Sequence, residues 1–247
     1  MQGELKDLLL AEAEQGIEEG CEKAIVEKIK EGIEVAKALG ELKRLERELS
    51  SLRPREGFSY IEPEGLEGIR AERPDGPRSL GIRLDEDELR NRLLGAWLGR
   101  CIGCMVGKPV EGWPKERIEE LLRQLGEWPL SGYFPEAEGL QLKEALRGKI
   151  TKALQDDDLD YTALNLHILE THGPSGTTEY VAREWLDHLP YHGVHTAERA
   201  TYRNLVLGLR PPEVTRFRNP YREWVGAGIR ADIYGYISPG LRSLPPA

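Results

Sequence analysis

A run of carboxylates is the densest group of potential metal ligands in this sequence. It consists of Asp156, Asp157, Asp158 and Asp160 within QDDDLDYTALNLHILETHG. An acidic run before an apolar repeat is typical of a helix start, where carboxylates cap backbone N–H groups and offset the helix dipole. One cap needs only one Asp, however, and adjacent carboxylates repel one another unless protons or cations intervene. Two interpretations therefore stay open, a helix cap and a site for a hard divalent ion such as Mg²⁺ or Ca²⁺.

A second pattern is a ladder of glycines at every fourth position. Its members are Gly95, Gly99, Gly103 and Gly107. Each glycine in an exposed helix costs about 1 kcal/mol relative to alanine. The ladder therefore predicts that another backbone or a ligand approaches this helix closely, either in a packed helical core or at a site where the helix ends. The helix leads into KPVEGW, where Pro109 should end it and present Glu111 just beyond.

A third segment is rich in glycine and carries a cation. In NPYREWVGAGIRADIYGYISPG, Gly226 and Gly228 flank a small residue and Arg230 follows. A glycine-rich turn that opens a helix can hold a phosphate through its backbone N–H groups, and an arginine can pair with the same phosphate. No strand precedes the segment, so it does not fit a dinucleotide-binding fingerprint.

The three cysteines predict neither a disulfide framework nor a four-ligand zinc site. Cys101 and Cys104 form a single C-x-x-C pair, and Cys21 lies far away. No second cysteine pair or paired histidine motif accompanies them. The surrounding sequence has a helical pattern, so we interpret these residues as small buried thiols in a helix.

These residues require helices to position them. Asp85 is a predicted N-cap for a helix over LDEDELRNRLLGAWLG. Further helices are expected over residues 115–125, 158–171, 178–188 and 196–207, the second ending at Gly173. No alternating pattern of strand length and no Asn-Gly or Asp-Gly hairpin signal occurs. The predicted fold class is all-α.

Residues 1–52 predict a helical hairpin that packs on the main body or on a partner. A shorter helix is expected over residues 4–19, with a break near Gly20. A longer amphipathic helix follows, with apolar residues spaced by three or four positions at Ile29, Ile33, Ala36, Leu39, Leu42, Leu45, Leu49 and Leu52. Residues 53–84 hold four prolines and several glycines, which predicts a connector with short helical turns at most.

Composition narrows the class of protein further. The chain has 247 residues, with 34 Lys and Arg against 43 Asp and Glu, for a net charge of −9. This balance argues against general binding to nucleic acid or to an anionic membrane. No apolar run approaches the ~20 residues that a membrane span needs, and the acidic start lacks the features of a signal peptide. We therefore expect a soluble, cytoplasmic protein.

The three motifs, in this order, resemble those of the ADP-ribosylglycohydrolase family. The resemblance rests on GAWLGRCIGCMVGKPVEGW, QDDDLDYTALNLHILETHG and GAGIRADIYGYISPG, and is greatest to a larger bacterial branch. It implies a compact all-helical bundle over residues 85–240 that binds two Mg²⁺ ions, or Mn²⁺ in some members. Residues 1–52 would then be a helical extension, and residues 241–247 a tail unlike the family.

The resemblance also implies roles for individual residues. The metal motif of the family, Thr-Asp-Asp, falls on Asp156, Asp157 and Asp158, with Asp in place of Thr and Leu159 in place of a following Thr. It implies catalytic roles for Glu111 and Asp157. The loop that holds the diphosphate and ribose of ADP-ribose falls on Gly226, Ala227, Gly228 and Arg230.

The implied reaction is hydrolysis of the glycosidic bond between ADP-ribose and a protein side chain or small molecule. The family has a second Asp-x-Asp motif that completes its two-metal site, and none occurs here after Asp160. We therefore expect a C-terminally incomplete bundle, weak Mg²⁺ binding and low turnover. Two alternatives are a non-catalytic ADP-ribose-binding module that self-associates through residues 1–52, and a chain that needs a separately encoded second half.

Overall fold

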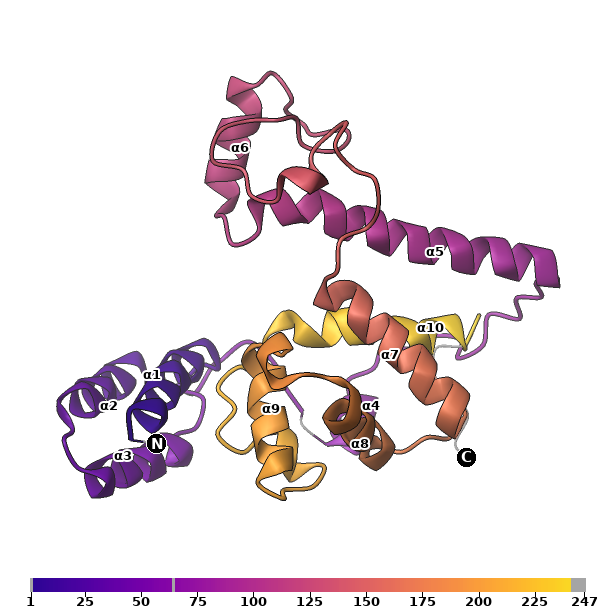
Figure 1. The fold of residues 1–247 in the computed structure, drawn as a ribbon. Coiled ribbons are helices and arrows are strands. Elements are labelled where there is room, and N and C mark those ends of the chain that lie inside the picture. The colour runs from indigo at the N-terminus through magenta and orange to yellow at the C-terminus, as the bar shows by residue number, and fades with distance from the viewer. Residues whose placement is uncertain (1, 64, 241–247) are drawn as a thin grey trace. The chain divides into compact units, whose positions relative to one another are not determined.

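A computed structural model describes residues 2–63 and 65–240 and confirms the all-α fold class, with no strand among those residues. The tail predicted at residues 241–247 lies outside the described residues. Figure 1 shows the helices along the chain. The α-helices are α1 (Gln2–Glu18), α2 (Lys23–Val35), α3 (Leu39–Ser51), α4 (Leu66–Ala71), α5 (Glu86–Gly107), α6 (Lys115–Gln124), α7 (Asp157–His172), α8 (Thr178–His188), α9 (Thr196–Val206) and α10 (Asp232–Tyr236). Short 3₁₀ helices are η1 (Lys108–Val110), η2 (Lys143–Ala145), η3 (Tyr191–Gly193), η4 (Glu213–Thr215) and η5 (Val225–Arg230).

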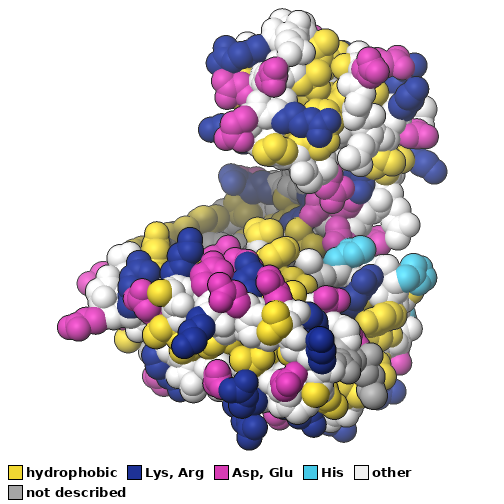
Figure 2. Space-filling view, turned by 90° about the vertical axis from the view of Figure 1, so that its left-hand side faces the viewer, with side chains coloured by type: hydrophobic (Ala, Val, Ile, Leu, Met, Phe, Trp, Pro, Cys, Tyr) yellow, Lys and Arg dark blue, Asp and Glu magenta, His cyan; other side chains and the backbone are white. Residues whose placement is uncertain are grey.

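The helix boundaries follow the local signals of the sequence. The Asp85 carboxylate accepts the Glu88 N–H at 2.8 Å and begins α5, as expected for an N-cap. Gly173, with φ +73°, ends α7 at the predicted position. No helix in the described ranges is both long and apolar enough to cross a lipid bilayer. Figure 2 shows acidic and basic side chains interspersed on the visible face.

The chain divides into two compact units, each built from two separate stretches of sequence. Unit 1 comprises residues 1–78 and 175–227, and unit 2 comprises residues 79–174 and 228–247. Residues 85–240, which resemble one family domain, therefore contribute to both units. Unit 1 contains α1–α4, α8 and α9, and unit 2 contains α5–α7 and α10.

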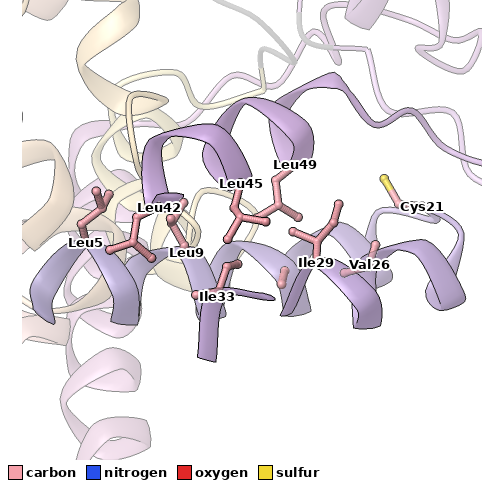
Figure 3. Close-up of a cluster of buried hydrophobic side chains, with 10 residues drawn as sticks. Leu5, Leu9, Cys21, Val26, Ile29, Ile33, Leu42, Leu45 and Leu49 are labelled. Carbon is pink, nitrogen blue, oxygen red and sulfur yellow. The ribbon is translucent and has the colours of Figure 1, made fainter. Parts of the chain in front are cut away.

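The N-terminal segment contains three helices where the sequence predicted two. Figure 3 shows their shared core, in which apolar side chains from α1, α2 and α3 meet. The buried members are Leu5, Leu9, Ala13, Cys21, Val26, Ile29, Ile33, Leu42, Leu45 and Leu49. The apolar stripe of residues 29–52 is thus buried largely within its own segment.

The break between α2 and α3 follows from the spacing of that stripe. A step of three residues falls about 60° short of a full helical turn. The four such steps from Ile33 to Leu45 would carry the stripe about 240° around one straight helix, so no single face could hold it. The helix is interrupted at residues 36–38, so that the apolar residues of α3 start on a new face. At this break the Glu41 carboxylate accepts the N–H groups of Lys37 at 2.9 Å and Ala38 at 3.1 Å.

Two arginines join the N-terminal helices to the later part of unit 1. Arg222 donates to Glu12 of α1 at 3.0 Å and to Glu19, the residue that follows α1, at 2.7 Å. Arg218 forms a bidentate ion pair with Glu46 of α3, with donor–acceptor distances of 2.6 and 2.9 Å. Both arginines precede η5 directly in the sequence, so residues 1–52 are attached to the segment that leads into the glycine-rich motif.

One hydrophobic core of unit 2 forms between α6, η1 and the segments around Phe134 and Leu146. It consists of Val110, Leu122, Phe134 and Leu146, with partly buried neighbours that include Trp113 and Ile118. This core fixes η1, and with it the residues at the C-terminal end of α5. The segment over residues 126–139 contributes Leu130 and Phe134 to this core and contains the cis peptide bond between Trp128 and Pro129.

The glycine ladder does not pack as the sequence predicted. All four of its glycines lie exposed on α5, and a Cβ added at any of them would meet no described atom within 4 Å. Instead, Cys104 and Met105 are the residues of α5 that are buried. The contacts of α5 with α7 lie on a neighbouring face of the helix, so the close backbone approach predicted along the ladder is absent from the described residues.

Candidate functional site

One stripe of α5 and the residue that follows the helix face the N-terminal end of α7. Arg100, Cys104 and Lys108 recur at every fourth position, which places them on one side of a helix. Each of them reaches an acidic residue at the start of α7. The Leu154 N–H donates to the Met105 sulfur at 3.3 Å and fixes the chain just before the acidic run. Acids and cations are thus positioned by the packing of two helices.

Asp156 is the most enclosed of the predicted metal ligands. It is the N-cap of α7 and accepts the Asp158 N–H at 3.0 Å, and the Lys108 ammonium forms an ion pair with its other oxygen. The Lys108 and Asp156 side chains are 14% and 10% exposed. Burial alone would raise the pKa of Asp156, but the bonds from Lys108 and the Asp158 N–H outweigh it and hold the pKa below its ordinary value.

A cysteine joins the acids at this point. The Cys104 sulfur and one carboxylate oxygen each from Asp156 and Asp158 all lie within 4.8 Å of one another. Burial and the nearby carboxylates raise the pKa of Cys104 to about 12, so the isolated thiol keeps its proton. The thiol is buried in a helix, as the sequence predicted, and it also contacts the acidic cluster.

Arg100 connects α7 to α10. Its Nε donates to Asp232 at 2.5 Å and its Nη1 donates to the Asp158 carbonyl at 3.0 Å. The Asp232 carboxylate also accepts the Tyr236 hydroxyl at 3.1 Å. The hydrogen bond from Arg100, with a smaller contribution from Tyr236, lowers the pKa of Asp232 despite partial burial. This network holds the acidic start of α7 against α5.

Glu111 lies at the edge of the cluster and is open to solvent. It follows η1, as predicted from Pro109, and its side chain is 71% exposed. Its carboxylate is 3.8 Å from the Lys108 ammonium, the same group that pairs with Asp156. The predicted catalytic glutamate and a predicted metal ligand therefore both lie beside the ammonium of Lys108.

The remaining acids of the run make local hydrogen bonds at the start of α7. The Asp158 N–H also donates to Asp157 at 3.1 Å, and Gln155 donates to Asp160 at 2.9 Å. Asp157 is half-buried at the first position of α7. Both interpretations of the run are compatible with this geometry, because Asp156 caps α7 and also lies beside Cys104 and Asp158.

The glycine-rich segment forms a 3₁₀ helix where the sequence predicted a turn that opens a helix. Residues 225–230 form the 3₁₀ helix η5, in which the small residues Gly226, Ala227 and Gly228 fit the tight turns of this helix type. The boundary between the units falls between Ala227 and Gly228. The Arg230 guanidinium lies over the Tyr161 ring of α7 at 5.0 Å.

The backbone of Arg230 is also attached to α7. Asn165 donates to its carbonyl at 3.0 Å, so two residues of α7 hold the end of η5 within unit 2. Sequence reasoning missed Tyr161 and Asn165, and it also missed Arg100 and Lys108. The repeat at residues 100, 104 and 108 was the signal that could have found the last two, since it places a cation, a thiol and a cation on one helix face.

The comparisons with known proteins bear on the same region. No curated protein and no solved structure matches the chain. The family described as ADP-ribosylglycohydrolase matches residues 85–238, which is more than half of the chain and includes α5, the acidic start of α7, η5 and α10. The chain therefore belongs to the ADP-ribosylglycohydrolase family.

Proposed function

We propose that this protein hydrolyses the glycosidic bond between ADP-ribose and a protein side chain or small molecule, with Mg²⁺ or Mn²⁺ as cofactor. The observation that carries the proposal is that Glu111 and Asp156 both lie beside Lys108, with Asp158 close to Asp156, inside the region that matches the family. Acidic groups near the anomeric carbon suit a reaction whose transition state resembles an oxocarbenium ion.

The donor set fits a divalent cation in charge and in spacing. The carboxylates of Asp156 and Asp158 supply hard oxygen ligands close to one another, and Asp157 adds a third on the same helix start. When bound, the metal would act as a Lewis acid that holds ribose hydroxyls and helps to activate water. Lys108 already compensates the charge of Asp156, so it competes with the metal for this carboxylate.

The other residues suit binding and proton transfer. The exposed carboxylate of Glu111 is accessible to a substrate and can accept or return a proton at the reacting oxygen or nitrogen. Arg230 presents a guanidinium at the end of η5, where it can pair with the diphosphate while Tyr161 supports it from one side.

A second candidate function is binding of ADP-ribose without turnover. Two observations favour it. Asp156 is already paired with Lys108. Among the described residues of unit 2, the group that could hold a metal consists of three side chains, Cys104, Asp156 and Asp158. A site with few ligands fixes the coordination geometry poorly, and catalysis depends on that geometry. We therefore expect the turnover to be low.

The test is to measure release of ADP-ribose from ADP-ribosyl-arginine and ADP-ribosyl-serine substrates with excess Mg²⁺ or Mn²⁺. We expect slow release that disappears in Asp157→Ala and Glu111→Gln and persists in Asp160→Asn, a matched change in the same acidic run. Binding of free ADP-ribose is measured in parallel by calorimetry. Binding without release would support the second candidate, and the absence of both would contradict the two proposals together.

A further inference from the structure

Unit 1 contains a cavity that the proposed hydrolysis does not use. Its volume is about 500 Å³, which lies within the range of about 300–1,000 Å³ that is usual for small-molecule sites. Its walls include residues of α1, η3 and α9, all of which belong to unit 1. None of the described residues that line it belongs to the acidic run of α7 or to the glycine-rich segment. The cavity is therefore separate in its residues from the proposed hydrolase site.

Two arginines one turn apart on α9 bring positive charge to this cavity. Arg199 and Arg203 are at positions i and i+4, so they share one face of the helix. The Arg199 Nε donates to the Val194 carbonyl at 2.8 Å. The Arg203 Nη2 donates to the Arg218 carbonyl at 3.0 Å. Both guanidinium groups are thus held by neutral acceptors, and within residues 2–63 and 65–240 neither has an ion-pair partner, so their charge is available to an anion.

Two carboxylates line the same cavity from α1. Glu4 and Asp7 are exposed, and within the described residues neither of them forms an ion pair with Arg199 or Arg203. Carboxylates accept hydrogen bonds from ribose hydroxyls at other nucleotide sites. A bare anion satisfies the arginines but is repelled by the acids. The two walls therefore favour a ligand that carries a phosphate at one end and hydroxyl donors beside it.

An aromatic side chain completes the set of recognition groups. Tyr191 of η3 lines the cavity and is 50% exposed. The Arg199 guanidinium lies 5.5 Å from the centre of its ring. Nucleobases stack on tyrosine rings and interact with arginine in the same way at many single-stranded nucleic-acid sites. The cavity thus offers an apolar surface to a base next to the cations that suit a phosphate.

We propose that this cavity binds a nucleoside phosphate. The phosphate pairs with Arg199 and Arg203. Glu4 and Asp7 accept the ribose hydroxyls, and the base stacks on Tyr191. The proposal goes beyond the proposed hydrolysis, because it assigns a second ligand site whose residues all belong to unit 1 and whose occupancy needs no turnover.

The first experiment uses the wild-type full chain. Arginines are modified with phenylglyoxal in the presence and absence of ADP, and the modified positions are mapped by mass spectrometry. We expect saturating ADP to slow the modification of Arg199 by about fivefold or more, because a bound phosphate covers its guanidinium. Arg183, an exposed arginine of α8, should react at the same rate in both samples.

Adenosine and inorganic phosphate serve as partial ligands in the same experiment. Each satisfies only part of the cavity, so each should protect Arg199 less than ADP does at equal concentration. Protection by inorganic phosphate that equals protection by ADP would overturn the assignment to a nucleoside phosphate. Equal modification of Arg199 with and without ADP would overturn the site itself.

The second experiment measures ADP affinity by isothermal titration calorimetry in buffer without divalent metal. We expect Arg199→Gln and Tyr191→Ala to weaken binding by about tenfold each, since one loses a phosphate partner and the other a stacking surface. Arg183→Gln is the matched control and should bind as the wild type does. Circular dichroism checks that each variant is folded.

Asp157→Ala separates this proposal from the proposed hydrolysis. The variant removes a residue of the proposed hydrolase site, and Asp157 does not line the cavity of unit 1, so ADP should bind with unchanged affinity. Binding that is lost in Asp157→Ala and retained in Arg199→Gln would place the nucleotide at the acidic cluster and overturn the proposal. An inactive hydrolase leaves all of these readouts intact, because none of them depends on turnover.

Discussion

At the scale of single residues, Lys108 decides how the acidic cluster behaves. Its ammonium, at the start of η1, lies beside both Asp156 at the start of α7 and Glu111 after η1, so it reduces the repulsion between these two carboxylates. The same contact makes Lys108 a competitor of any divalent cation at Asp156. The strength of the proposed metal binding would therefore depend on a residue that is not itself a ligand.

We predict that Lys108→Met raises the affinity for Mg²⁺ by about fivefold to tenfold, which corresponds to about 1–1.4 kcal/mol. The physical reason is that the metal no longer has to displace an ammonium from Asp156. Isothermal titration calorimetry measures this directly. Lys149→Met, which removes an ammonium paired with Glu136 in the same unit, should leave the affinity unchanged. Weaker Mg²⁺ binding in Lys108→Met would show that the lysine supports the site.

The Arg100–Asp232 pair predicts a dependence of stability on pH. The hydrogen bond from Arg100 lowers the folded-state pKa of Asp232 below its unfolded value. The contribution of Asp232 to the free energy of unfolding is therefore fully present above the ordinary Asp pKa of about 3.9, and it is lost as the pH falls through the lower folded-state pKa.

Asp232→Asn should accordingly destabilise the protein at pH 5, with a difference from the wild type that shrinks as the pH falls below about 4. Urea unfolding followed by circular dichroism at several pH values measures this difference. Asp187→Asn is the control, since Asp187 lies 3.6 Å from Arg183 in an exposed pair and should have little effect. A difference that stays constant from pH 5 to strongly acidic pH would contradict the assignment.

At the scale of elements, α5 carries two stripes with different roles. The stripe of Arg100, Cys104 and Lys108 makes the contacts that build the site, whereas the neighbouring glycine ladder contacts no described atom through its Cβ positions. The ladder therefore costs helix stability without a compensating contact in the described residues, about 1 kcal/mol per glycine.

We predict that Gly99→Ala stabilises the protein by about 0.5–1 kcal/mol, because the added methyl group meets open space and alanine favours the helix. Chemical denaturation measures the change. The control, Gly173→Ala, should destabilise the protein by a similar amount, since Gly173 ends α7 with φ +73°. Destabilisation by Gly99→Ala would instead mean that a backbone packs along the ladder in solution.

At the scale of the whole molecule, residues 1–52 are a structural part of unit 1. Their apolar stripe is buried in their own three-helix core, and two arginines near η5 bind carboxylates on α1 and α3. Self-association through this segment stays a prediction. The ion pairs show a second role, in which the N-terminal helices hold residues 216–222 in position.

We predict that Glu12→Gln combined with Glu19→Gln increases amide hydrogen exchange over residues 213–222, because Arg222 then loses both carboxylate partners while partly buried. Mass spectrometry measures the exchange peptide by peptide, and α5 and α7 should be unaffected. Glu14→Gln is the matched control on α1, because Glu14 pairs with Lys30 inside the N-terminal segment. Unchanged exchange at residues 213–222 would show that the arginines do not fix this segment.

Local signals in the sequence determined most of the elements. The N-cap at Asp85, the acidic start of α7 and the glycine at its end each act within a few residues, so the boundaries of α5 and α7 could be predicted from nearby side chains. The order of the three motifs was enough to indicate the family that the comparison then showed. These inferences need no knowledge of which helices touch.

Only the tertiary structure decided which face of α5 meets α7. The glycine ladder and the stripe through Cys104 lie one residue apart in the sequence and about 100° apart around the helix. Local sequence does not determine which of two adjacent helix faces packs against another helix. The same holds for the burial of the N-terminal stripe, since only the tertiary structure shows that α1 joins α2 and α3 in one core. Pairs such as Arg100 with Asp232 join residues 132 positions apart, and their energies exist only once the helices have packed.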